Sequence, residues 1–446
     1  MTQCNGLPLS FSRLGRKKIQ ADFAGGYLTS DAGAVLLREV DKRIGLIDAL
    51  AACFCDHRDP AKTQHKVHTL LAQRIFAVAM GYEDLNDHDQ LRHDPLLQLL
   101  TERPWDQPQP LASASTLCRW ENRVDRATLV RMAAVFVQQF LASADRAPEQ
   151  IVLDFDATDD RVHGQQEGRF FHGYYRHYCF LPLYVFCGDQ LLAAYLRPSK
   201  IDAAKHSRAV LKLLVEQIRQ AWPKVRIIVR ADSGFCRWKL LRWCDRHDVD
   251  YIIGLAKNAV LTRRLEPWMQ AACERFNTSG QRQRLFTEFT YAAETWDRPR
   301  RVLGKAEHND RGANPRFVVT SLRGDPQKLY EHVYCQRGEM ENRIKEQQLD
   351  LFADRTSCHR FAANQLRLLL SSAAYVLLES LRRLGLQGTE LTRAQAGTIR
   401  LKLLKIGARV NASVRRVVLH LASSYPFKAL LERVLRRLRG AHLHPT

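Results

Sequence analysis

Two apolar runs in this 446-residue chain each end at an aspartate that is followed by turn residues. Ile151 to Leu153 leads into Asp156 in the segment IVLDFDATDD, and Val225 to Arg230 leads into Asp232 in VRIIVRADSGF. Apolar and β-branched residues dominate both runs, so each is expected to form a β-strand that stops at its acidic residue. In an open α/β sheet, ligand chemistry collects just beyond the carboxyl ends of the strands. The two carboxylates are therefore expected to face one cleft.

A third acidic residue, Glu341, lies in the segment QRGEMENRIKEQQLDLF, which is rich in helix-favouring Glu, Gln, Lys and Arg. We expect it to enter the cleft from a helix laid against the sheet. Hard cations such as Mg²⁺ prefer oxygen ligands, and two such ions held close together activate an attacking water and stabilise a leaving phosphate oxygen. Asp154 is an alternative ligand because it precedes Asp156 by two residues and points to the same side of the strand. Asp232, before Ser-Gly, is alternatively a simple turn residue.

The segments LDFDATDD, RADSGF and YCQRGEMENRIKEQ together resemble the DDE transposases of bacterial insertion sequences. The resemblance is to the branch whose third motif reads Tyr-x2-Arg-x3-Glu-x6-Lys, and within it to the insertion-sequence thirteen-eighty group. Tyr334, Arg337 and Glu341 match this motif position by position, whereas Gln348 stands where the motif has its Lys. Lys345 lies one helical turn earlier and is expected to reach the same phosphate. The resemblance implies that the motif's Tyr and Arg also contact DNA.

The resemblance implies a site, a cofactor and a reaction. Asp156, Asp232 and Glu341 would be the catalytic residues and the ligands of two Mg²⁺ ions, for which Mn²⁺ is able to substitute. Water would first cut at the ends of the element, and the exposed 3′ hydroxyl would then attack target DNA, with no covalent protein intermediate. The partner would be double-stranded DNA, both terminal repeats and target. Because one site must act at each end of the element, a homodimer is expected.

Three other functions stay open or are disfavoured on the sequence. A metal-dependent nuclease of the same fold would keep the three acids but would not join DNA strands. A catalytically inactive DNA-binding relative would keep the basic ends of the chain. A recombinase with Tyr334 as nucleophile is disfavoured, because it would need several arginines and a histidine around that tyrosine and would leave the three acids unexplained.

The charge of the chain agrees with a DNA partner. The net charge is +21, from 68 Lys and Arg against 47 Asp and Glu, and such an excess binds polyanions by releasing their counterions. From Leu391 onward there are 12 Lys or Arg and one acid, Glu432. This tail carries RLKLLKIG, VRRVVLHL and LLERVLRRLRG at helical spacing, so we expect a basic helical domain. The alternative for such a charge run is a solvated helix face.

The spacing of the three acids suggests the order of domains. Asp156 and Asp232 are 76 residues apart, but Asp232 and Glu341 are 109 apart, which is more than one strand and a short connection use. Periodicity predicts an α/β protein with a β-rich insertion and helical domains at both ends, and the resemblance implies that its core is ribonuclease-H-like. The predicted boundaries are a helical DNA-binding domain at 1–145, the first part of the core at 146–256, the insertion at 257–333, the last core helices at 334–385, and the basic domain at 386–446.

The predicted insertion contains an aromatic and basic cluster. Trp296 lies beside Arg298, Arg300 and Arg301. The indole ring is suited to stack on a flipped base while the arginines hold phosphates, so Trp296, Arg298 and Arg300 are candidate DNA-binding residues. The alternative is that Trp296 packs within the small sheet.

The remaining features indicate a cytosolic protein, and the resemblance implies the bacterial cytosol, in association with the nucleoid. The longest near-apolar run, Leu368 to Leu378, is too short to span a bilayer, and the amino end lacks an apolar signal region. Eleven cysteines without a CxxC pair indicate thiols in a reducing compartment.

The segment Cys53-x-Cys55-Asp56-His57, with His65 and His68 nearby, invites a zinc site, because thiolates and imidazoles bind zinc. A second pair at finger spacing is absent. A cysteine pair in a helical core is therefore the preferred interpretation.

Overall fold

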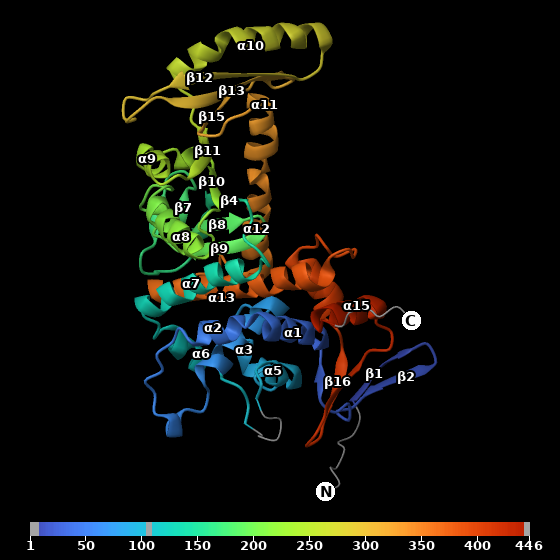
Figure 1. Cartoon of the computed structure of the whole chain (residues 1–446). Helices are drawn as coiled ribbons and strands as arrows, with labels where there is room; N and C mark the ends of the chain where they lie inside the picture. Colours follow the sequence, from blue (N-terminus) through green and yellow to red (C-terminus); the bar gives the residue numbers. More distant parts are fainter. Residues whose placement is uncertain (1–8, 104–108, 441–446) are drawn as a thin grey trace. The chain divides into compact units, whose positions relative to one another are not determined.

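The computed structural model describes residues 9–103 and 109–440, which form two compact units. The first unit combines both ends of the chain, up to Glu121 and from Leu377 onward, and the second comprises Asn122–Val376 (Figure 1). The predicted sequential domains differ from this division, because the amino- and carboxyl-terminal segments share one unit.

A large mixed sheet forms the centre of the second unit. Its strand order is β12-β13-β15-β11-β10-β4-β8-β9, with β14 paired to β13. Strands β4, β10 and β11 run parallel, whereas the other neighbouring pairs are antiparallel. The strands are β4 Gln150–Ala157, β8 Leu183–Cys187, β9 Gln190–Tyr195, β10 Arg226–Ala231, β11 Asp250–Leu255, β12 Gln283–Tyr291, β13 Arg300–Asn309, β14 Gly312–Ala313 and β15 Arg316–Thr320. The predicted α/β class is confirmed, as is the order of antiparallel strands followed by strands that alternate with helices.

Each face of this sheet is covered by a different set of helices. One face packs against four helices, whose apolar side chains join a single cluster with alternate strand residues. These helices are α7 Arg126–Ala142, α8 Ser207–Ala221, α9 Trp238–Arg246 and α10 Ala259–Ser279. The other face packs against a helical column made of α11 Pro326–Lys328, the π-helix η4 Leu329–Tyr334, the 3-10 turn η5 Cys335–Arg337 and α12 Gly338–Leu351. A small second sheet, β5 Asp160–Arg161, β7 His177–Phe180 and β6 Phe170–His172, follows β4.

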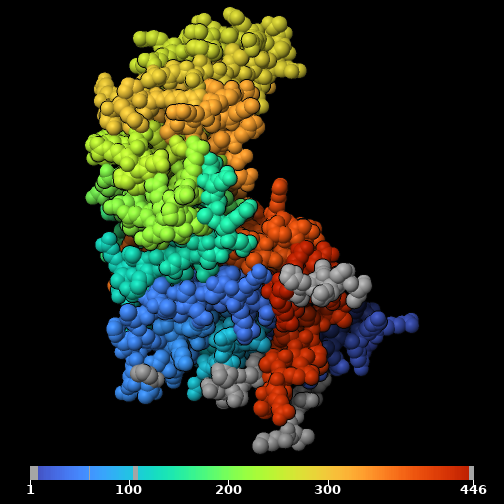
Figure 2. All heavy atoms as spheres, in the orientation of Figure 1, coloured from blue at the N-terminus to red at the C-terminus, as the bar shows by residue number. Residues whose placement is uncertain are grey.

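The segment 257–333 differs from the predicted β-rich insertion in two ways. It begins with the 21-residue helix α10, which the sequence analysis did not predict, and its strands extend the central sheet instead of forming a sheet of their own. Asn258 starts the helix by accepting a hydrogen bond from Leu261 N at 2.9 Å. Leu261, Leu265 and Ala272 are buried at helical spacing. In Figure 2, side chains fill the space between α10 and the strands β12 and β13.

The first unit is mainly helical around the predicted amino-terminal helices. They are η1 Ala32–Ala34, α1 Val35–Ile44, α2 Leu46–Ala51, η2 Pro60–Lys62, α3 Val67–Met80, α4 His88–Leu91, α5 Pro95–Leu100 and α6 Ala114–Glu121, preceded by the hairpin β1 Leu9–Leu14 and β2 Lys17–Ala21. The basic tail supplies η6 Arg382–Leu386, α14 Ala396–Ile399, the π-helix η7 Arg400–Leu404 and α15 Lys428–Leu438.

The prediction that the basic tail is entirely helical is wrong for the segment VRRVVLHL. Its residues Val417–Leu421 form strand β17, which pairs with β16 Ala408–Ala412, and β16 in turn pairs with β3 Leu28–Thr29. Two adjacent β-branched valines favour a strand. Pairing with β16 supplies hydrogen-bond partners for the backbone of β17, and this pairing could not be inferred from the helical spacing of the apolar residues.

Several contacts join the two ends of the chain within this unit. Lys405 Nζ lies 2.6 Å from Asp31 Oδ1, and Arg400 Nε donates to Ala79 O at 3.0 Å. Gly33 packs so tightly that a Cβ there would lie 1.7 Å from Leu403 O. Neither end segment can therefore complete this packing alone.

One helical stretch, Phe361–Leu386, is long and apolar enough to cross a membrane by length and composition. It consists of α13 Phe361–Leu381 followed by η6. Within the protein, 83% of its most apolar window is buried, which is typical of a core helix.

Candidate active site

The alternation of side chains along β4 and β10 places the polar residues on one face of the sheet. Apolar residues of both strands, such as Leu153 and Val229, enter the cluster beneath the sheet. The residues between them face the helical column. Asp154, Asp156 and Arg230 therefore share the face that carries the helical column.

Strand pairing sets Asp156 and Asp232 beside each other. In the parallel pair β4 and β10, Asp154 lies opposite Arg230 and Phe155 opposite Ala231, so one further residue on each strand gives Asp156 and Asp232. Neighbouring strands lie about 4.8 Å apart. Asp156 Oδ1 accepts from Ala157 N, and Asp232 Oδ1 accepts from Gly234 N, both at 2.9 Å. One oxygen of each carboxylate is thus fixed at a strand end by a backbone hydrogen bond, and the second oxygen takes no part in these two bonds.

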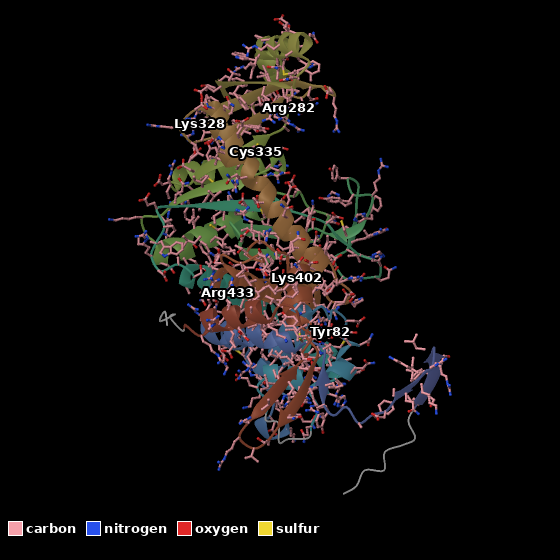
Figure 3. All side chains as sticks on the ribbon, turned by 90° about the vertical axis from the view of Figure 1, so that its right-hand side faces the viewer. Tyr82, Arg282, Lys328, Cys335, Lys402 and Arg433 are labelled. Atoms are coloured by element: carbon pink, nitrogen blue, oxygen red, sulfur yellow. The ribbon has the colours of Figure 1, made fainter. Side chains whose placement is uncertain are left out.

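Glu341 reaches the same place from the first turn of α12. Figure 3 shows the helical column, with Cys335 labelled on it, running past the sheet. One turn before Glu341, Arg337 lies between two of the predicted acids. Its guanidinium is 3.2 Å from Asp156 Oδ2 and 2.6 Å from Glu341 Oε1. Arg337 therefore connects the strand-end carboxylate to the helix carboxylate.

The electrostatics of Asp156 reflect both of the other acids. Burial raises the pKa of Asp156 to about 6; Arg337 opposes this rise, and the charges of Asp232 and Glu341 add to it. Burial alone would lower the pKa of Arg337, but Asp156 and Glu341 hold it above its ordinary value. The site thus concentrates negative charge around one guanidinium.

The donor set suits a hard divalent cation, although the acids do not form a ready ligand cluster. Among the described residues, no group of three or more His, Cys, Asp or Glu side chains is placed to hold a metal ion. The Arg337 guanidinium stands between Asp156 and Glu341 and supplies the positive charge there. Carboxylate oxygens are the ligands that Mg²⁺ and similar ions prefer, so the residues fit such an ion in chemistry.

The alternative ligand, Asp154, has a structural role. Its two oxygens accept from Arg230 Nε at 2.5 Å and Arg230 Nη2 at 2.7 Å, and both side chains are buried. Arg230 Nη1 also donates to Val333 O at 2.5 Å, in the helical column. This pair ties β4, β10 and the column together behind Asp156. Asp154 is therefore occupied by a buried ion pair, and Asp156 stays the predicted ligand.

Tyr334 packs beneath Asp232 at a close backbone approach. A Cβ built on Gly254 would lie 2.6 Å from Tyr334 Oη and 2.8 Å from Ser233 N, so only glycine fits there. Burial raises the pKa of Tyr334. Tyr334 is therefore packed against the backbone next to the turn that carries Asp232.

We expect Gly254→Ala to reduce the free energy of unfolding by about 1–3 kcal/mol, because the new methyl group overpacks Tyr334 and the turn after Asp232. Thermal melting measures the effect. Gly338→Ala is the matched control, since a Cβ there meets no atom within 4 Å and Ala favours helix. Equal behaviour of the two variants would contradict the proposed role of this approach.

Gln348, at the position of the motif lysine, and Lys345, one turn earlier, have different surroundings. Gln348 Nε2 donates to Asp160 Oδ1 at 2.9 Å and Asp159 O at 3.1 Å, so this residue fastens α12 to the turn after β4. Lys345 is exposed and lies four residues after Glu341, on the same side of α12. Lys345 is thus placed for an external phosphate, and Gln348 is not.

The predicted DNA-binding cluster at Trp296 is not arranged for that role. Arg300 is buried, and its guanidinium contacts Asp245 at 2.7 Å and Asp297 at 2.9 Å. Arg298 is 2.6 Å from Asp245 as well. Trp296 packs edge-to-face on Tyr291 against the core. Trp296 is thus packed against the core, as the alternative expected, and Arg300 is paired with acids that the linear sequence did not reveal.

The cysteine segment near residue 53 has no zinc-binding arrangement among the described residues. Cys53 is buried, as the preferred interpretation expected, whereas Cys55 is exposed. None of the cysteines in the described ranges is in a disulfide.

Acidic side chains at the ends of adjacent parallel strands, facing a helix with an arginine and a further acid, define an α/β protein whose side chains suit cations and phosphates in chemistry. The sequence matches the family model "Transposase DDE domain group 1" over residues 11–443. The chain belongs to this family of DDE transposases.

No curated protein sequence is significantly similar to the chain. Among solved structures, the chain resembles piggyBac transposase in a cryo-EM structure of its synaptic complex with hairpin DNA. The identity is 9%, the match covers 84% of this chain and 79% of that one, and the TM-score is 0.43. A TM-score of this size does not establish a common fold.

Proposed function

We propose that this transposase cuts the ends of an insertion sequence and joins them to target DNA, with Asp156, Asp232 and Glu341 as its catalytic residues. The observation that carries the proposal is the meeting of these three acids, distant in sequence, around Arg337 on one face of the sheet. A ribonuclease-H-like core fits the strand order β9-β8-β4-β10-β11. The insertion-sequence thirteen-eighty group is the proposed subfamily, on the motif of Tyr334, Arg337 and Glu341.

DDE transposases generally use divalent metals. We propose two Mg²⁺ ions per site, replaceable by Mn²⁺, held by the three acids. When bound, such ions activate the attacking water or 3′ hydroxyl and offset charge on the leaving oxygen.

The chain's own residues position the phosphate. Arg337 offers a planar fork of N–H donors that matches a phosphate, and a DNA phosphate would replace one of its two carboxylate partners. Lys345, on the same side of α12, is placed for a neighbouring phosphate. Tyr334 supports the turn that carries Asp232 through its packing on Gly254.

The proposed partner is double-stranded DNA, for which the net charge of +21 is suited. A homodimer is proposed because the reaction acts on two element ends. The bacterial cytosol, at the nucleoid, is the proposed location.

The test is incubation of the protein and Mg²⁺ with labelled DNA that flanks its coding region, followed by sequencing of every product junction. Joined products support a transposase, whereas nicks alone would indicate a nuclease of the same fold. DNA binding without any cleavage in Mg²⁺ or Mn²⁺ would indicate an inactive relative and overturn the proposal.

A further inference from the structure

A cavity of about 310 Å³ lies beside α9 in the second unit. Helix α9 begins six residues after Asp232 in the sequence. Arg208, in the first turn of α8, lines one side. The other lining residues lie on α9 or directly after its last residue. They form two rows along the helix, because residues four apart lie one above the other. These rows are Trp238, Arg242 and Arg246, and Lys239, Trp243 and His247.

The cations of this cavity form no ion pair among the described residues, although the pKa of Asp297, lowered by a hydrogen bond from Arg300, is also lowered by the charge of Arg242. No Asp or Glu lines it, and none of its four Lys and Arg side chains forms an ion pair with another residue of the described ranges. Elsewhere in this unit arginines are neutralised: Arg298 and Arg300 share Asp245, which also belongs to α9. The positive charge at the cavity, which no ion pair of the described residues neutralises, therefore favours an external polyanion.

The aromatic rings give the cavity a second property. Trp243 stacks on His247 with ring centroids 4.2 Å apart and planes at 14°. Trp238 has Lys239 Nζ at 5.5 Å and the Arg242 guanidinium at 5.8 Å from its ring centroid. Indoles interleaved with cations are the combination that holds unpaired nucleic acid, since bases stack on the rings while phosphates meet the charges.

We propose that the α9 cavity binds an unpaired stretch of the DNA substrate, with phosphates on Arg242 and Arg246 and a base on Trp238. The proposal rests on the proposed function for the identity of the ligand. The sequence suggested an aromatic and basic DNA site near Trp296. The proposal places such a site on α9 instead, the helix that follows Asp232 in the sequence.

The first test is the salt dependence of binding to a labelled single-stranded oligonucleotide, without divalent metal. Loss of two phosphate contacts in the double variant R242Q/R246Q should lower the slope of log K against log salt by about 1.4. The control K212Q/R226Q loses the same charge, but these cations are already paired with Glu216 and Asp250, so its slope should stay near wild type. Equal slopes in the two double variants would overturn the proposal.

The second test isolates the stacking. Trp238→Leu should weaken single-strand binding about tenfold, and Trp238→Phe, which keeps an aromatic face, should retain most of it. Wild-type affinity in Trp238→Leu would overturn the assignment of the base to Trp238.

The two proposals fail separately. If wild-type protein cleaves and joins DNA ends but these variants bind like their controls, only the α9 site is wrong. If the variants lose binding as expected but no cleavage occurs, the proposed function is wrong while the cavity still binds DNA.

Discussion

Replacing Asp232 with Asn is expected to slow end cleavage about 1000-fold, with DNA binding and stability close to wild type. Asn keeps an oxygen that accepts the Gly234 N–H bond, and Asn is as good as Asp at starting a helical turn. The charge is what disappears. A cation held by carboxylates contributes several kcal/mol of transition-state stabilisation, and each 1.36 kcal/mol is a factor of ten in rate. The measurement is the cleavage rate of labelled end DNA at saturating Mg²⁺.

Asp325 offers a matched control for this variant. It also starts a short helix, by accepting from Lys328 N at 2.8 Å, and Asp325→Asn makes the same chemical change away from the three acids. We expect normal cleavage from it. If Asp232→Asn cleaved DNA as fast as Asp325→Asn, the assignment of the second catalytic acid would be wrong.

The largest expected effect on stability is in the first unit, where Glu121 and Arg74 form a buried ion pair. Glu121 Oε1 accepts from Arg74 Nε at 2.9 Å, and Arg74 Nη1 lies 3.0 Å from His88 Nε2. Burial, together with Arg74, lowers the pKa of His88 to about 3, so the histidine is neutral at physiological pH and adds no charge beside Arg74. Glu121→Ala should therefore cost about 3–5 kcal/mol.

For a unit of this size, that loss lowers its melting temperature by roughly 10 °C. Calorimetry on the full chain measures the shift. The double variant Arg74→Met with Glu121→Leu removes both charges and should recover most of the loss, because an apolar pair of similar volume replaces a buried ion pair with little cost. If the double variant melted below Glu121→Ala, desolvation of a lone Arg74 would not be the cause.

The sequence predicted the strands around the site because their signals are local. The apolar runs before Asp156 and Asp232, and the helix-forming residues around Glu341, report burial and propensity within a few residues. The parallel pairing of β4 and β10 then follows from the fold class. For this reason the three acids could be assigned to one neighbourhood before the structure.

Features that depend on partners far apart in sequence escaped prediction. Arg300 looked available for DNA until the structure brought Asp245 to it, 55 residues away. The basic cavity likewise needs Arg208 of α8 beside the rows of α9. Helix α10 contains Pro267, which weakens its local signal, and depends on packing against β13. Strand β17 depends on pairing with β16.

The way the first unit is assembled has a consequence for biosynthesis. Its amino-terminal helices need β16 and η7 as packing partners, and these leave the ribosome only after the whole second unit. Domains generally fold as they emerge, so the second unit can be complete while the earliest-made helices still wait for their partners. A nascent chain released early would therefore carry a finished acidic site but an unfinished first unit.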